Sequence, residues 1–134
     1  MLNSSGTLRV RAYTASGALP VEGATVRITG ASEDTRLIAY SSITDRNGQS
    51  ELFTLPAPSV DYSLAPSPDE LPYSVYDLEI SAPGYFTKTV RGLTVFSGIN
   101  SVQLINMIPG SGKLITDYPR GNINYIISEN NDLQ

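Results

Sequence analysis

Residues 16–29 read Ser-Gly-Ala-Leu-Pro-Val-Glu-Gly-Ala-Thr-Val-Arg-Ile-Thr, a turn followed by a strand. In the second half, Ala24, Val26 and Ile28 alternate with polar residues. A period of two places the apolar side chains on one face, which predicts a β-strand over Ala24–Thr29. The preceding residues are typical of a turn, because Gly23 permits positive φ and the proline fixes its own φ.

The same alternation continues on both sides of this stretch. Upstream, Leu8, Val10 and Ala12 alternate with polar residues and predict a strand over Thr7–Tyr13. The strands predicted downstream are Arg36–Ile43, Gln49–Leu55, Val75–Ala82, Tyr85–Val90, Leu93–Phe96 and Asn100–Ile108. Eleven glycines and nine prolines leave few windows for a helix. We therefore expect an all-β fold, an antiparallel β-sandwich of about seven short strands.

Two connections between these strands have distinct chemistry. The segment Thr44-Asp45-Arg46-Asn47-Gly48 ends in Asn-Gly, which predicts a hairpin between the strands on either side. Residues 56–72 hold five prolines, with tyrosine and leucine between them. Prolines exclude helix and central strand, and the apolar residues argue against full exposure, so we expect an ordered loop lying on the sheet.

The chain divides into a sandwich and a tail. We assign residues 1–109 to the sandwich and residues 110–134 to a C-terminal tail or connector. Within the tail, Ile123, Tyr125 and Ile127 alternate with other residues and predict an extra strand at 122–128. An exposed apolar strand invites aggregation, so we expect it to be covered by its own sheet or by another chain.

Composition excludes several classes of function. The chain has 134 residues, a net charge of −4, and no Cys or His; it therefore has neither disulfides nor zinc sites of the Cys/His type. Its nine basic residues are scattered, which argues against nucleic-acid binding. We expect no membrane span and no signal peptide, and hence synthesis in the cytoplasm.

Three motifs carry a resemblance to a known family. Pro20-Val21-Glu22-Gly23-Ala24-Thr25-Val26, Thr44-Asp45-Arg46-Asn47-Gly48-Gln49 and Ala82-Pro83-Gly84-Tyr85 follow in this order. They resemble the carboxypeptidase regulatory-like domains, over about residues 6–105. The resemblance implies a transthyretin-like (prealbumin-like) sandwich. It says little about function, since such domains are attached to many different partners.

A narrower resemblance bears on function. Leu55-Pro56-Ala57-Pro58-Ser59-Val60-Asp61-Tyr62-Ser63-Leu64, followed by Pro72-Tyr73-Ser74-Val75-Tyr76, is similar to the N-terminal propeptide region of clostridial spore cortex-lytic enzymes of the SleC type. In that family a protease removes this region during germination and activates a peptidoglycan-cleaving domain. The resemblance implies a non-catalytic accessory or propeptide-like module, associated with the spore, that docks on a lytic domain as chaperone or inhibitor.

Two alternatives remain open. One alternative to the propeptide-like module is a stand-alone adhesive or structural module that assembles by β-strand addition. The other is a glycan-binding domain in contact with peptidoglycan. The residues expected to make these interactions are Tyr62, Tyr73, Tyr76, Ile123, Tyr125 and Ile127. For the tyrosines, the structural alternative is that they wedge the proline-rich loop onto the sheet, with their hydroxyl groups bonded to the backbone.

The remaining candidates have simpler structural explanations. Asp45 and Asn47 resemble half of a calcium loop, but a hairpin turn accounts for them. Asp77 and Glu79 share one face and suggest acid–base chemistry, but pairing across strands with arginines such as Arg27 is simpler. The serines lack a base, and no lysine precedes Lys88 to form an isopeptide bond with Asn. We therefore expect no catalytic, cofactor-binding or metal-binding residues, and no enzyme.

Overall fold

The computed structural model describes residues 2–15, 17–59, 72–117 and 127–128. Their regular elements are strands, apart from one 3-10 turn, η1 (Glu33–Thr35). The strands are β1 (Ser4–Thr14), β2 (Leu19–Pro20), β3 (Thr25–Gly30), β4 (Ala39–Ile43), β5 (Phe53–Ala57), β6 (Ser74–Ser81), β7 (Thr87–Val95), β8 (Asn100–Asn106), β9 (Lys113–Asp117) and β10 (Ile127–Ser128). None of the described residues forms a helix long and apolar enough to cross a membrane.

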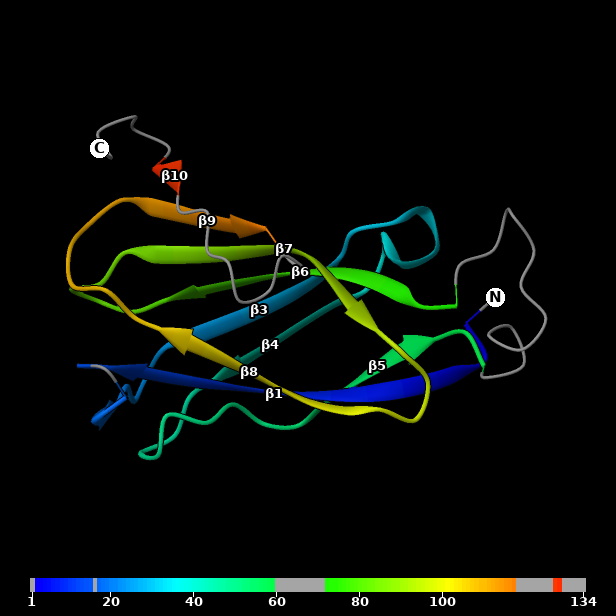
Figure 1. The fold of residues 1–134 in the computed structure, drawn as a ribbon, viewed down its shortest axis with the longest axis horizontal. Helices are drawn as coiled ribbons and strands as arrows, with labels where there is room; N and C mark the ends of the chain where they lie inside the picture. Colours follow the sequence, from blue (N-terminus) through cyan, green and yellow to red (C-terminus); the bar gives the residue numbers. More distant parts are fainter. Residues whose placement is uncertain (1, 16, 60–71, 118–126, 129–134) are drawn as a thin grey trace.

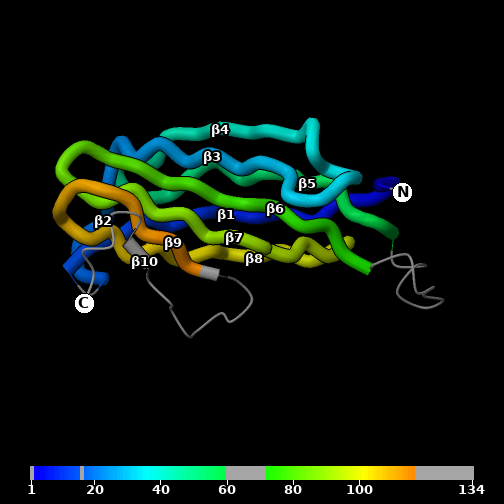
Figure 2. Tube along the Cα trace, turned by 90° about the horizontal axis from the view of Figure 1, so that it is seen from above, coloured from blue at the N-terminus to red at the C-terminus, as the bar shows by residue number. Residues whose placement is uncertain are grey.

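The strands form two sheets that pack face to face (Figures 1 and 2). In the first sheet β1 is central, with β8 along one side and β5 and β2 along the other. The second sheet has the order β10-β9-β7-β6-β3-β4. The all-β sandwich predicted from the sequence is therefore confirmed.

The sheets are mixed, which corrects the expectation of purely antiparallel pairing. β8 runs parallel to β1, and β9 runs parallel to β7. The described residues also contain ten strands rather than about seven, because β2 and β10 are short pairings and β9 follows the predicted sandwich. Alternation of apolar residues reports which face is buried and carries no information about the direction of the neighbouring strand.

The core lies between the two sheets and follows the predicted alternation. The inward faces of β1, β3 and β6 are almost completely buried, at Leu8, Val10, Ala12, Val26, Ile28, Tyr76, Leu78 and Ile80. Burying each of the large side chains contributes on the order of 1.5–3 kcal/mol. This shared apolar layer holds the two sheets together.

The turn after β4 forms, but it does not join two paired strands as predicted. Gly48 takes a φ of 76° and donates to the Asp45 carbonyl at 2.8 Å, as the Asn-Gly signal indicates. Beyond the turn, the Ser50 amide donates to the carbonyl of Val10 on β1 at 2.8 Å. This contact directs the chain into the first sheet, so β4 and β5 belong to different sheets.

The predicted break at Arg91-Gly92 is a bulge inside one continuous strand, β7. The register against β6 shifts between the pairs Tyr76–Leu93 and Leu78–Val90. Gly92 has a φ of 76°, and its amide donates to Asp77 Oδ1 at 2.9 Å. A glycine with positive φ suits the extra residue of a bulge.

Part of the predicted tail belongs to the second sheet. Lys113–Asp117 forms β9, and Leu114 and Thr116 are buried against the sandwich. β10 pairs with β9 through Ile127 and Ile115. The predicted strand at 122–128 otherwise lies outside the described residues.

Candidate interaction surface

The structure describes two of the four predicted binding tyrosines, Tyr73 and Tyr76, and Tyr76 is a core residue. Tyr76 is 0% exposed, and its hydroxyl donates to the Pro56 carbonyl at 2.6 Å. Burial raises the pKa of the Tyr76 phenol above its ordinary value. Tyr76 is therefore a packing residue with its hydroxyl bonded to the backbone, and its predicted place on a binding surface is wrong. Tyr62 lies outside the described residues.

Tyr73 lies near the surface and has an aromatic neighbour. Its ring is 5.3 Å from that of Phe96, at an interplanar angle of 53°. Phe96 remains 40% exposed and follows the end of β7. The sequence predicts Phe96 at the end of the strand Leu93–Phe96 and indicates no role for it. Its position just before a Ser-Gly turn was the only available sign of exposure.

Short polar contacts tie the start of the chain to the segments that follow β5 and β7. The Ser59 amide donates to Asn3 Oδ1 at 3.0 Å, and the hydroxyls of Ser4 and Ser97 lie 2.7 Å apart. Figure 1 shows that β5 ends and β6 begins at the end of the sandwich where β1 starts. Both described flanks of the proline-rich segment are therefore held at one end of the sandwich.

Two of the three tail residues predicted to interact, Ile123 and Tyr125, lie outside the described residues. The third, Ile127, contributes its backbone to β10. A role of this strand in binding another chain stays a prediction.

Among the residues that the structure describes, strand β8 forms one edge of the first sheet (Figure 2). It contains neither a charged residue nor a proline, the two features that usually protect an edge strand. On its outer face Val102 is 58% exposed and Leu104 is 52% exposed, whereas Ile105 is buried in the core. The Phe96–Ile99 turn, with both of its end residues exposed, leads directly into β8.

The hydrogen bonds at both ends of β8 show which peptide groups face outward. The Thr7 amide donates to the Ile99 carbonyl at 3.0 Å, and the Met107 amide donates to the Tyr13 carbonyl at 2.7 Å. Peptide groups alternate in direction along a strand, so the odd-numbered residues of β8 face β1. The even-numbered residues, Val102 and Leu104 among them, direct their N–H and C=O groups away from β1.

A buried lysine covers one end of this edge. Lys88 on β7 is only 8% exposed, and its Nζ donates to the Asn106 carbonyl at 2.9 Å. Burial lowers the pKa of Lys88. The contact satisfies one outward carbonyl of β8, and it agrees with the direction deduced for the even-numbered residues.

The carboxylate of Asp45 accepts hydrogen bonds from the backbone of its own turn. Asp45 Oδ1 accepts hydrogen bonds from the amides of Asn47 at 2.8 Å and Gln49 at 3.0 Å. These bonds lower the pKa of Asp45. The described part of the chain holds no cluster of three or more potential metal-binding side chains. The turn interpretation therefore accounts for this motif.

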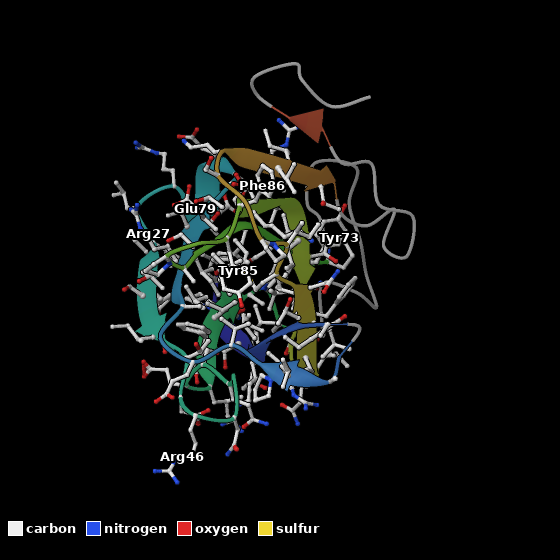
Figure 3. All side chains as sticks on the ribbon, turned by 90° about the vertical axis from the view of Figure 1, so that its left-hand side faces the viewer. Arg27, Arg46, Tyr73, Glu79, Tyr85 and Phe86 are labelled. Carbon is white, nitrogen blue, oxygen red and sulfur yellow. The ribbon has the colours of Figure 1, made fainter. Side chains whose placement is uncertain are left out.

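Asp77 and Glu79 each have a structural partner. Glu79 lies opposite Arg27 in the register of β3 and β6, with Oε1 3.9 Å from the guanidinium (Figure 3). Asp77 holds the Gly92 amide at the bulge. The predicted cross-strand pairing is confirmed for Arg27 and Glu79.

Comparison with known proteins supports the fold. No protein-family model and no curated protein matches the chain. Solved structures similar to it include the Bacillus anthracis TIE protein (TM-score 0.51, 15% identity, covering 79% of this chain and 17% of that one). A putative carbohydrate binding protein from Bacteroides uniformis is also similar (TM-score 0.51, 11% identity, 80% and 43% coverage). So is catechol 1,2-dioxygenase from Acinetobacter sp. ADP1 (TM-score 0.52, 14% identity, 79% and 53% coverage).

These likenesses extend to the fold alone. The chain spans between 17% and 53% of the length of these three solved chains. All three similarities confirm a β-sandwich, and the identities are too low to assign an activity.

Proposed function

We propose that this chain is a non-catalytic docking module that binds a protein partner by adding a strand to β8. The observation that carries the proposal is the edge itself: an uncharged strand of seven residues with outward peptide groups and exposed Val102 and Leu104. In strand addition, backbone hydrogen bonds supply affinity, and alternate side chains supply specificity. β8 offers both.

The partner we propose is the lytic domain of a spore cortex-lytic system. The support is the resemblance of the Leu55–Tyr76 segment to the propeptide region of SleC-type enzymes. Tyr73 belongs to this segment and packs against Phe96, and Phe96 lies in the turn that enters β8. A lytic domain docked on β8 would therefore also contact this aromatic pair. This chain would then act as a chaperone or an inhibitor of the lytic domain.

A proline variant tests this docking mode. Val102→Pro removes an outward N–H and places a ring at the edge, while leaving the hydrogen bonds to β1 intact. We expect it to weaken binding to a clostridial SleC-type lytic domain at least about tenfold, or about 1.4 kcal/mol, in calorimetric titration. Phe96→Ala should weaken the same complex, because it removes half of the aromatic pair.

The control uses the other sandwich edge. Ile43→Pro changes an exposed residue at the end of β4, the edge strand of the second sheet, and should leave the affinity unchanged. If the unaltered protein neither binds nor inhibits the lytic domain, the proposed partner is wrong. Equal binding by the Val102 variant and the unaltered protein would reject β8 as the docking strand.

Self-assembly through the same edge is the second candidate. If two copies pair antiparallel about Gln103, Val102 faces Leu104 of the second copy and Asn100 faces Asn106. All of these residues direct their peptide groups outward, although the Asn106 carbonyl already accepts a hydrogen bond from Lys88, and no pair brings like charges together. Sedimentation over a wide concentration range tests it: dimers lost in Val102→Pro support self-assembly, and monomers throughout dismiss it.

A further inference from the structure

A second candidate site lies at the opposite end of β1 from the Tyr73–Phe96 pair. An open pocket of about 560 Å³ lies between the β1–β2 turn and the Asp45–Gln49 turn. This volume falls within the range of ~300–1,000 Å³ that is usual for small-molecule sites. The residues that give the pocket its chemistry are Arg11, Tyr13, Pro20, Asn47, Gln49 and Leu104.

Backbone contacts hold both walls of this pocket in place. The Ala12 amide donates to the Gly48 carbonyl at 2.7 Å, and the Val21 amide donates to the Ala12 carbonyl at 3.0 Å. Gly48 needs its φ of 76° and its lack of a side chain, because an added Cβ would collide with the Ala12 carbonyl. The pocket is therefore formed before a ligand arrives, which lowers the entropic cost of binding.

The side chains of the pocket present unused hydrogen-bond donors. Arg11 makes no ion pair or hydrogen bond through its guanidinium within the described residues, and the carboxamides of Asn47 and Gln49 likewise have no partner there. In the adjoining turn, Asp45 Oδ1 accepts hydrogen bonds from the amides of Asn47 and Gln49, and Asp45 does not line the pocket. The Arg11 guanidinium is thus available to an outside acceptor.

From this chemistry we propose that the pocket binds a saccharide that carries a carboxylate. A guanidinium forms paired hydrogen bonds with a carboxylate, which selects for an anionic group. Carboxamides donate to and accept from vicinal hydroxyl groups, which are characteristic of sugar rings. The aromatic face of Tyr13 and the aliphatic Leu104 suit the apolar C–H face of a pyranose.

The test is a titration of isotope-labelled protein followed by amide chemical shifts. D-glucuronate is the probe, D-glucose tests the need for the carboxylate, and acetate tests the need for the sugar ring. We expect saturable shifts at Arg11, Tyr13 and Gln49 with glucuronate, and affinities at least about fivefold lower for glucose and acetate. Absence of saturable shifts with glucuronate overturns the proposal, as does equal binding of all three probes.

Variants then assign the effect to Arg11. Arg11→Gln should lower the glucuronate affinity at least about fivefold, and Gln49→Ala should lower it by a smaller factor. The matched control is Arg46→Gln, which removes the same charge from a side chain that points into solvent away from the sandwich (Figure 3). Equal losses in the Arg11 and Arg46 variants would indicate general charge attraction and would overturn the site. Glucuronate binding does not depend on β8 docking, so Val102→Pro should retain it.

Discussion

The ammonium group of Lys88 donates a hydrogen bond to the carbonyl oxygen of Asn106, 2.9 Å away, and thereby ties β7 of one sheet to the last residue of β8 in the other. Few lysines are buried to this degree in proteins. The charged ammonium group is tolerated because the Asn106 carbonyl accepts its hydrogen bond. The same contact leaves fewer unpaired peptide groups at the edge of β8.

Burial of Lys88 predicts a pH dependence of stability. Its pKa is lowered in the folded chain, so the unfolded chain holds the proton more tightly. The free energy of unfolding should therefore rise with pH between the lowered pKa and the ordinary value of 10.5. Urea unfolding across this window should show the rise in the unaltered protein and not in Lys88→Met. Parallel curves for the two proteins would argue against a perturbed lysine.

The Tyr76 hydroxyl should contribute measurably to stability. Tyr76→Phe leaves the Pro56 carbonyl without its donor and should reduce the free energy of unfolding by about 1 kcal/mol at neutral pH. Because burial raises the phenol pKa, the unaltered protein should also lose stability above the unfolded tyrosine pKa of about 10. The Phe variant should lose less there, and an unchanged midpoint at neutral pH would dismiss the bond.

The two carboxylates of β6 should differ in their importance. Asp77→Ala removes the acceptor of the Gly92 amide at the bulge and should cost ~1–3 kcal/mol. Glu79→Ala serves as the control. It removes a partly exposed ion pair at 3.9 Å, and should cost less than about 1 kcal/mol. If thermal unfolding showed the same loss of stability in both variants, the bulge contact would contribute no more than the exposed ion pair.

Proline substitutions along β8 should alternate in their effect on stability. Gln103→Pro removes an N–H directed at β1 and leaves a backbone carbonyl of β1 without its donor. The free energy of unfolding should fall by at least ~2 kcal/mol. Val102→Pro removes an outward N–H and should cost clearly less. Denaturant unfolding of both variants compares them directly, and similar losses would show that the strand orientation has been misassigned.

The sequence predicted the faces of the strands better than their neighbours. Alternation at Leu8, Val10 and Ala12 identifies the buried side of β1, because burial acts on each residue locally. The parallel partner of β1 follows about 90 residues later in the chain, and no local pattern records that pairing. The same limit hid the division of β4 and β5 between sheets, which depends on the contact of Ser50 with Val10.

The candidate sites were predicted only in part for the same reason. The tyrosine cluster was visible in the sequence. Whether each ring is buried or exposed depends on which face of its strand the residue occupies. Tyr76 lies on the same buried face of β6 as Leu78. The β8 edge and the Arg11 pocket arise from long-range pairing. Arg11 and Gln49 meet through an isolated bridge between distant segments, which no motif in the sequence encodes.

Hydrogen exchange along β8, followed residue by residue, tests the central claim most directly. In the free protein, the amides of Val102 and Leu104 should exchange quickly, and those of Gln103 and Ile105 slowly. On addition of the lytic domain, or on self-association at high concentration, the two fast amides should become protected. Slow exchange of Val102 and Leu104 in the free monomer, or fast exchange that persists in the complex, would contradict docking at this edge.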